Sequence, residues 1–148
     1  MIRAGLLPAL LVAACALSCS SADEAVEYAA QEARDNAERG RQHVEAAVRA
    51  KRHEGAGAAL TEAVVLDPDA VFAERVVDGG FEVDAAYYGS GTAGGGWSAE
   101  TSRVRVCVRF AARVEPPTVE ARAVDCPGSL PTVVPGFGTF DRTVPLTD

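Results

Sequence analysis

The sequence predicts an α+β fold, in which a long N-terminal helix precedes a four-stranded antiparallel β-meander with one disulfide. Three observations support this fold class. Small and apolar residues recur every three or four positions between Ala22 and His53, as on one face of a helix. Apolar and polar residues alternate from Arg103 to Val114, as in a half-buried strand. An Asp-Gly pair and a Pro-Pro pair separate the extended segments.

The 148 residues suit one domain with a leader and a tail. We divide the chain into four regions: a signal peptide at 1–18, a helical segment at 19–57, an antiparallel sheet at 58–126 and a tail rich in proline and glycine at 127–148. The tail is expected to be extended or partly disordered.

The first region has the pattern of a secretory signal. Arg3 supplies a basic start, and no charged residue follows between Ala4 and Ser18. This uncharged stretch is about 15 residues long, shorter than the ~20 that a membrane-spanning helix needs, and Pro8 interrupts it. The pattern therefore predicts export rather than a membrane-spanning helix.

Two cysteines, Cys15 and Cys19, end this stretch after small residues and resemble the lipobox of bacterial lipoproteins. In that family the cysteine thiol carries a diacylglyceryl group and the signal is cut before it. "VAAC" fits the usual pattern better, whereas lipidation of Cys19 in "ALSC" leaves an even pair of cysteines in an oxidising compartment. We favour Cys19 and keep Cys15 as the alternative. The chain resembles small lipoproteins of actinobacteria, and the resemblance implies a lipid anchor on the outer, extracytoplasmic face of the cell membrane.

The helix predicted from Ala22 to His53 carries a narrow seam of small residues. "EGAG" at 54–57 ends this helix, and a second short helix is predicted at Ala58–Leu66. The seam is expected to lie on the protein's own domain, with an envelope protein or a second copy of the chain as the alternative partner. Its members are Val26, Ala30, Ala33, Ala37, Gly40, Val44 and Ala47.

The first two strands are predicted around the Asp78-Gly79 turn. This pair is a strong hairpin signal, and it sets Val76 opposite Phe81 and Arg75 opposite Glu82. A helix through residues 71–77 is the alternative.

The strand Arg103–Val114 is expected to turn back at Pro116-Pro117. If Cys107 faces Cys126, Phe110 faces Ala123 and Arg113 faces Glu120. This register predicts a Cys107–Cys126 disulfide. The order of one helix and four strands is similar to cystatin-like and NTF2-like folds, by fold analogy only.

Most functional classes find little support in the sequence. The formal charge of −7 argues against nucleic acid as a partner. "GSGTAG" at 89–94 has dinucleotide-binding spacing, but a strand rather than a helix is expected after it, so a flexible hairpin loop is the simpler interpretation. His43 and His53 are too far apart to share a metal, and no nucleophile arrangement is found. The sequence therefore predicts no enzyme, metal or cofactor.

A binding or scaffolding role remains, with candidate ligand contacts at two places. Aromatic residues flank the glycine-rich segment, and arginines line the polar side of the strand Arg103–Val114, where an anionic ligand or an envelope polymer could bind. A pocket for a small ligand between helix and sheet is the alternative function. The candidate contacts are Tyr87, Tyr88, Trp97, Arg105 and Arg109.

Overall fold

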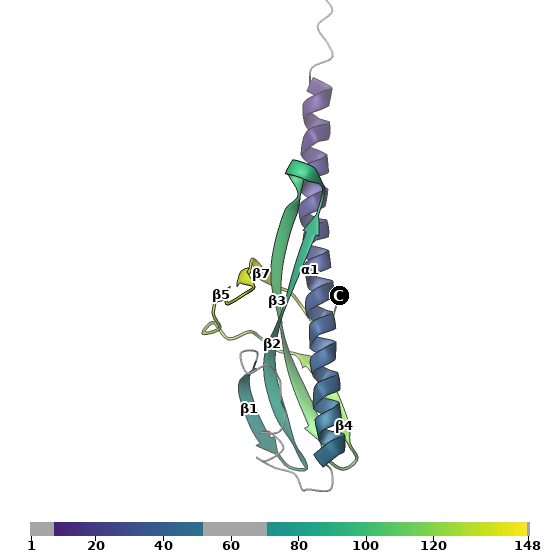
Figure 1. Ribbon diagram of the computed structural model, residues 1–148, viewed down its shortest axis with the longest axis vertical. Coiled ribbons are helices and arrows are strands. Elements are labelled where there is room, and N and C mark those ends of the chain that lie inside the picture. The colour runs from purple at the N-terminus through teal and green to yellow at the C-terminus, as the bar shows by residue number, and fades with distance from the viewer. Residues whose placement is uncertain (1–7, 52–70, 148) are drawn as a thin grey trace, which may run out of the picture.

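The computed structural model describes residues 8–51 and 71–147, and Figure 1 shows an elongated molecule in which one long helix lies along a curled sheet. The elements are α1 (Pro8–Lys51), β1 (Val71–Val77), β2 (Gly80–Ala93), the short 3-10 helix η1 (Gly96–Ser98), β3 (Glu100–Arg113), β4 (Thr118–Ala123), β5 (Val133–Val134), β6 (Gly138–Thr139) and β7 (Arg142–Thr143). The α+β class is confirmed.

Helix α1 is longer than the sequence predicts. It contains the expected segment from Ala22 to Lys51 and continues in the N-terminal direction through Cys19 and Cys15 to Pro8. Proline suits the first turn of a helix, where its missing N–H costs no hydrogen bond. Within residues 8–51 and 71–147, no helix is both long enough and apolar enough to cross a bilayer. The predicted helix at Ala58–Leu66 and the residue His53 lie outside the described residues.

The seam of α1 packs against the protein's own sheet, as expected. Its alanines and valines are buried, although Val26 and Ala47 lie at the edge and are half-buried. Small side chains let the helix backbone approach β2 very closely. A Cβ added at Gly89 would overlap the Ala29 carbonyl oxygen and the Ala33 amide nitrogen. The buried residues of the seam are Ala30, Ala33, Ala37, Gly40 and Val44, and the buried side of α1 also includes Ala25, Ala29 and Val48, which the predicted seam lacks.

The sheet has five strands rather than the predicted four. Strands β1 to β4 form the expected antiparallel meander, and β7 adds a parallel pairing to β3. The predicted β1–β2 register is confirmed, with Val76 opposite Phe81 and Arg75 opposite Glu82. Residues 71–77 are therefore a strand and not a helix.

The predicted β3–β4 register is wrong by two residues, although the disulfide is confirmed. Phe110 faces Ala121 instead of Ala123, and Arg113 faces Thr118 instead of Glu120. Cys126 lies beyond the last residue of β4, where the chain leaves the ladder after Val124 donates its N–H to the Cys107 carbonyl (3.1 Å). The Cys107–Cys126 bridge joins Cα atoms 5.4 Å apart. The two cysteines therefore bond without being direct cross-strand partners.

The tail folds back on itself in a short hairpin and is then joined to the sheet. Strands β5 and β6 form a small ladder of their own, and β7 then runs along β3. Asp141 donates its N–H to the Arg103 carbonyl (2.7 Å), and Val144 donates to the Arg105 carbonyl (2.8 Å). Strand β3 is thus bordered by β4 along its second half and by β7 along its first half.

Candidate functional site

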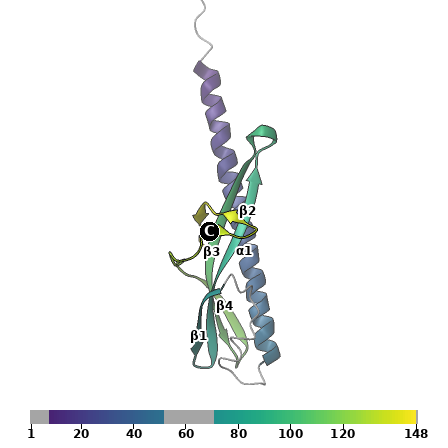
Figure 2. The same ribbon diagram turned by 60° about the vertical axis from the view of Figure 1, so that its left-hand side comes forward.

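The paired strands β2 and β3 have two different faces. The inner face packs against α1 and holds the apolar core, with Phe81, Val83, Val106 and Phe110 fully buried. We call the opposite side, which looks away from α1, the outer face. Because side chains alternate along a strand, the polar residues of β2 and β3 gather on the outer face. Figure 2 shows the C-terminal tail lying beside these strands.

An ion pair with a buried carboxylate and half-exposed arginines lies at the centre of the outer face. Asp84, 5% exposed, accepts hydrogen bonds from Arg109 Nε (2.7 Å) and Nη2 (2.9 Å), and Arg75 Nη2 lies 3.2 Å from the same carboxylate. The hydrogen bonds from Arg109 hold the pKa of the Asp84 carboxyl below its usual value, although burial opposes this. The same bonds raise the pKa of Arg109. Arg109, a candidate ligand contact, is thus already occupied by Asp84.

Arg105 is the second predicted arginine on this face, and its surroundings are different. It is 8% exposed, and its guanidinium carbon lies 4.1 Å from the centre of the Phe140 ring. Nη2 reaches Thr143 Oγ1 at 3.4 Å, whereas Nε and Nη1 have no hydrogen-bond partner among the described residues. Cation–π attraction compensates part of the cost of burying this charge. Arg105 therefore holds the tail through an aromatic ring instead of a carboxylate.

An aromatic cluster completes the cover over Arg105. The ring of Tyr88 lies 5.5 Å from that of Phe137 and 6.4 Å from that of Phe140. Both phenylalanines belong to the C-terminal tail, so Tyr88 and Arg105 together seat the tail on the sheet.

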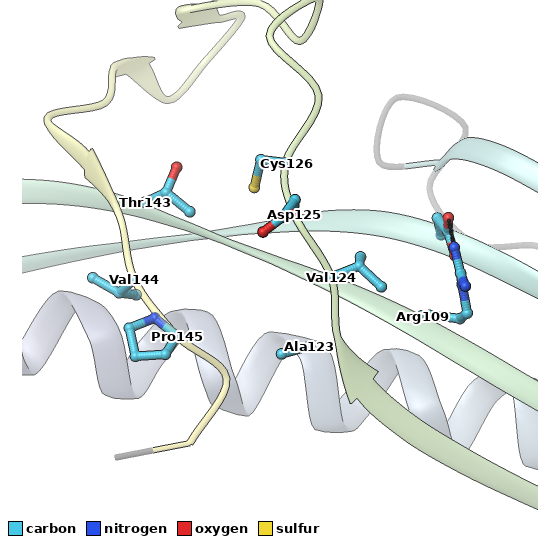
Figure 3. Close-up of a pocket in the computed structure, with 9 residues that line it drawn as sticks. Arg109, Ala123, Val124, Asp125, Cys126, Thr143, Val144 and Pro145 are labelled. Carbon is cyan, nitrogen blue, oxygen red and sulfur yellow. Dashed lines mark hydrogen bonds and ion pairs between the residues drawn. The ribbon is translucent and has the colours of Figure 1, made fainter.

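A cleft of about 710 Å³ opens beside the ion pair, and Figure 3 shows its walls. One wall is the chain that leaves β4, and the other is the end of the tail. This volume lies in the range of roughly 300–1,000 Å³ that is typical of ligand pockets. The lining is mixed, with charged, polar and apolar groups: Asp84, Arg109, Ala123, Val124, Asp125, Cys126, Thr143, Val144 and Pro145.

A smaller cavity of about 230 Å³ lies between α1, β4 and the end of the tail. Arg34, Ala37 and Glu38 line it from the helix, Ala121 from the strand and Leu146 from the tail. Its volume is below the usual range for a ligand pocket.

The three predicted aromatic contacts do not form one site. Tyr87 lies on the inner face, with its ring edge-on to Phe110 at 6.0 Å, while Tyr88 lies on the outer face. Trp97 is in η1, at the far end of the β2–β3 hairpin, and is fully exposed. Neighbouring residues on a strand point to opposite sides, which separates Tyr87 from Tyr88.

The glycine-rich segment is a strand and not a loop. Residues 89–93 belong to β2, and the turn covers only residues 94–99. Gly89 and Gly91 are needed because the backbone of α1 occupies the space of a side chain at both positions.

Sequence reasoning missed Asp84, Thr143 and the tail aromatics. Asp84 could have been found from its two-residue spacing after Glu82, which puts both carboxylates on the face that carries the β3 arginines. The contribution of Phe137 and Phe140 has no local signal, since it depends on a tail that folds back along β3.

The described residues contain no group of three or more side chains suited to hold a metal ion. His43 is exposed on α1. Comparisons with protein-family models, with curated proteins and with solved structures find no match for this chain.

Proposed function

We propose that this protein is a lipid-anchored component of the bacterial cell envelope, on the outer face of the membrane, with a non-catalytic binding role. The observation that carries the proposal is the uncharged segment that ends at Cys19, whose residues from Pro8 onward form the first part of α1. From Cys19 to Lys51 this helix is about 48 Å long at 1.5 Å per residue. A lipid on Cys19, or on Cys15, would thus be joined to the sheet through a continuous helix.

The close packing of α1 against the sheet supports a role in which the anchored helix presents the outer face to a binding partner. Because Gly89 and Gly91 bring β2 against the helix backbone, the sheet has little freedom to rotate about the helix. The outer face and its cleft are therefore held in one orientation relative to the anchor. The mixed lining of the cleft, with Arg109, Asp125 and Thr143, suits an extended segment of an envelope protein or polymer.

The alternative function is binding of a small ligand between helix and sheet, as the analogy with cystatin-like and NTF2-like folds suggests. The cavity beside Ala37 and Leu146 favours it, since it lies between α1 and β4. Its volume of about 230 Å³ would admit only a small molecule, so we rank this function second.

Intact mass spectrometry of the detergent-extracted native protein tests the anchor. The expected mass is that of a chain cleaved before Cys19 or Cys15 and carrying acyl chains. Reduction of the Cys107–Cys126 disulfide should add the mass of two hydrogens. A full-length mass without acyl groups would refute the proposal.

Photocrosslinking in intact cells tests the binding role. A photoreactive residue in place of Thr143 lies in the cleft, whereas the same residue in place of His43 lies on the exposed side of α1. A discrete adduct from position 143 that is absent from position 43 is the expected result. Equal labelling at both positions would argue against the cleft as the binding site.

A further inference from the structure

Strands β2 and β3 form a long hairpin, which we call the arm. The end of the arm has no charges and exposes an aromatic side chain, unlike the outer face. We call residues 94–99 the arm tip. The tip has no charged residue, and it presents Trp97, the one tryptophan of the chain, at 103% exposure. A tryptophan ring buries on the order of 150–250 Å² when it finds a partner surface. Full exposure of this large apolar ring to water is unfavourable, so we expect a partner surface to cover it.

The tip is a formed turn. Ser98 donates its N–H (3.3 Å) and its hydroxyl (2.9 Å) to the Gly95 carbonyl, and η1 covers residues 96–98. Gly94 and Gly96 have positive φ angles of 82° and 62°, which favour glycine. Trp97 is thus presented by a defined backbone.

Contacts between α1 and β2 determine how far the arm reaches along the helix. Gly91 lies against the backbone of Ala25 and Ala29, and Gly89 lies against that of Ala29 and Ala33. Two residues of strand therefore match four residues of helix, as expected from rises of about 3.3 and 1.5 Å per residue. Both views show the arm running beside the N-terminal half of α1, as Figures 1 and 2 illustrate.

The same relation places the arm tip close to the lipid-anchor position. From Gly91 the strand and turn continue by about four residues, or roughly 13 Å. This distance equals about nine residues of helix, which leads from the level of residue 27 to about residue 18. Trp97 therefore lies near the level of Cys19 along the axis of α1.

We propose that the arm tip contacts the lipid headgroup region, with Trp97 in the membrane interface beside the acylated cysteine. This inference rests on the proposed lipid anchor and adds a second point of membrane contact. Tryptophan is enriched at the membrane–water interface because its ring is apolar and its N–H remains hydrogen-bonded. The adjacent charges, Asp23, Glu24 and Glu100, are acidic, so the contact depends on the ring and not on attraction to anionic lipid.

Two contacts would orient the molecule. With Cys19 and Trp97 both at the surface, α1 and the arm stand side by side on the membrane, and the β1–β2 turn at Asp78-Gly79 points away from it. The outer-face cleft is then held at a constant height in the envelope.

Fluorescence of the native protein in vesicles tests the contact, because Trp97 is the one tryptophan. The detergent-extracted protein is reconstituted into phosphatidylcholine vesicles that contain lipids brominated near the headgroup end of the acyl chains. We expect blue-shifted emission, strong quenching by these lipids, weaker quenching by lipids brominated at the chain ends, and no change on adding salt. Emission that is insensitive to bromine and accessible to aqueous acrylamide would overturn the inference.

A matched control moves the tryptophan to the other end of the molecule. Trp97→Phe combined with Val76→Trp puts the indole on β1, at a position that is 58% exposed. This control should be quenched by acrylamide and not by brominated lipid. Bromine quenching at both positions would mean that the domain lies flat, which also overturns the inference. A blue shift without bromine quenching would indicate that protein covers the tip, with the same consequence.

Intact mass on the same preparation separates the two proposals. An acylated mass with a water-exposed Trp97 leaves the anchor in place and refutes the membrane contact. A mass without acyl chains refutes the anchor, and the membrane contact falls with it.

Discussion

The inner and outer faces of the β2–β3 pair are held by different physical means. On the inner face, Gly89, Gly91 and the alanines of α1 let the backbones of β2 and α1 come together. This close approach is possible because these residues have small side chains or none. On the outer face, Asp84, Arg109 and the Cys107–Cys126 bridge supply specific bonds between chemically distinct groups. The inner face should therefore tolerate no added atom, and the outer face should tolerate changes that keep its charges balanced.

The largest effect is expected from removing the covalent bond of the outer face. Replacing both cysteines, Cys107→Ser with Cys126→Ser, should lower the free energy of unfolding by about 3 kcal/mol, since the bridge closes a loop with a sequence separation of 19. Urea denaturation followed by circular dichroism measures this. A loss below about 1 kcal/mol would mean that β4 and the tail hold the chain together without the bridge.

The inner face is tested by adding one methyl group. Gly89→Ala places a Cβ on the backbone of Ala29 and Ala33, so α1 must move, at a cost of about 2 kcal/mol. Gly95→Ala is the matched control, because its Cβ would meet nothing within 4 Å and its φ is −152°. Similar midpoints for both variants in thermal unfolding would show that the helix is not tightly seated.

The ion pair of the outer face predicts an acid dependence. Because the folded pKa of Asp84 is lowered, its contribution to stability is complete above the unfolded pKa of about 3.9 and is lost as the pH falls through the folded value. Asp84→Asn should cost about 1.5 kcal/mol at pH 7 and flatten the stability profile below pH 4. Denaturation midpoints of both proteins between pH 7 and pH 2 measure the difference. Parallel profiles would assign the acid dependence to other carboxylates.

The smallest effect is expected at Arg105. Its buried guanidinium has no carboxylate partner among the described residues, so Arg105→Met removes a desolvated charge and keeps an unbranched chain beneath Phe140. The free energy of unfolding should change by less than about 1 kcal/mol, in either direction. A loss above about 2 kcal/mol would mean that the cation–π contact between Arg105 and Phe140 stabilises the docked tail more than its geometry suggests.

Elements with local signals were predicted well from the sequence. The β1–β2 register follows from the Asp78-Gly79 turn, and the middle of the α1 seam follows from its period, although the seam lacked Ala25, Ala29 and Val48. Both depend on residues close in sequence, where turn type and helical spacing restrict the arrangement. The Cys107–Cys126 pairing was predicted for the same reason, since it spans a single reversal.

Features that depend on distant segments were predicted poorly. The β3–β4 register was wrong because a disulfide can join residues outside the ladder, so it does not determine which residues face each other. The outer-face site was incomplete because Phe137, Phe140 and Thr143 reach it only through β7, which has two residues and no strand pattern. The glycines at 89 and 91 were taken for a loop because their partner is the helix backbone, more than fifty residues earlier.

One edge of β3 pairs with two different strands, β4 and β7, and this arrangement has a consequence for aggregation. Strand edges with free N–H and C=O groups recruit strands from other chains. Strand β4 covers one half of this edge of β3, and β7 covers the other half. Strand β7 lies near the last residues of the described chain. A chain cleaved after β6 would lose the N–H groups of Asp141 and Val144 and expose the carbonyls of Arg103 and Arg105 to a neighbouring molecule. Proteolysis in the tail would therefore turn this edge of β3 into a template for intermolecular strand addition.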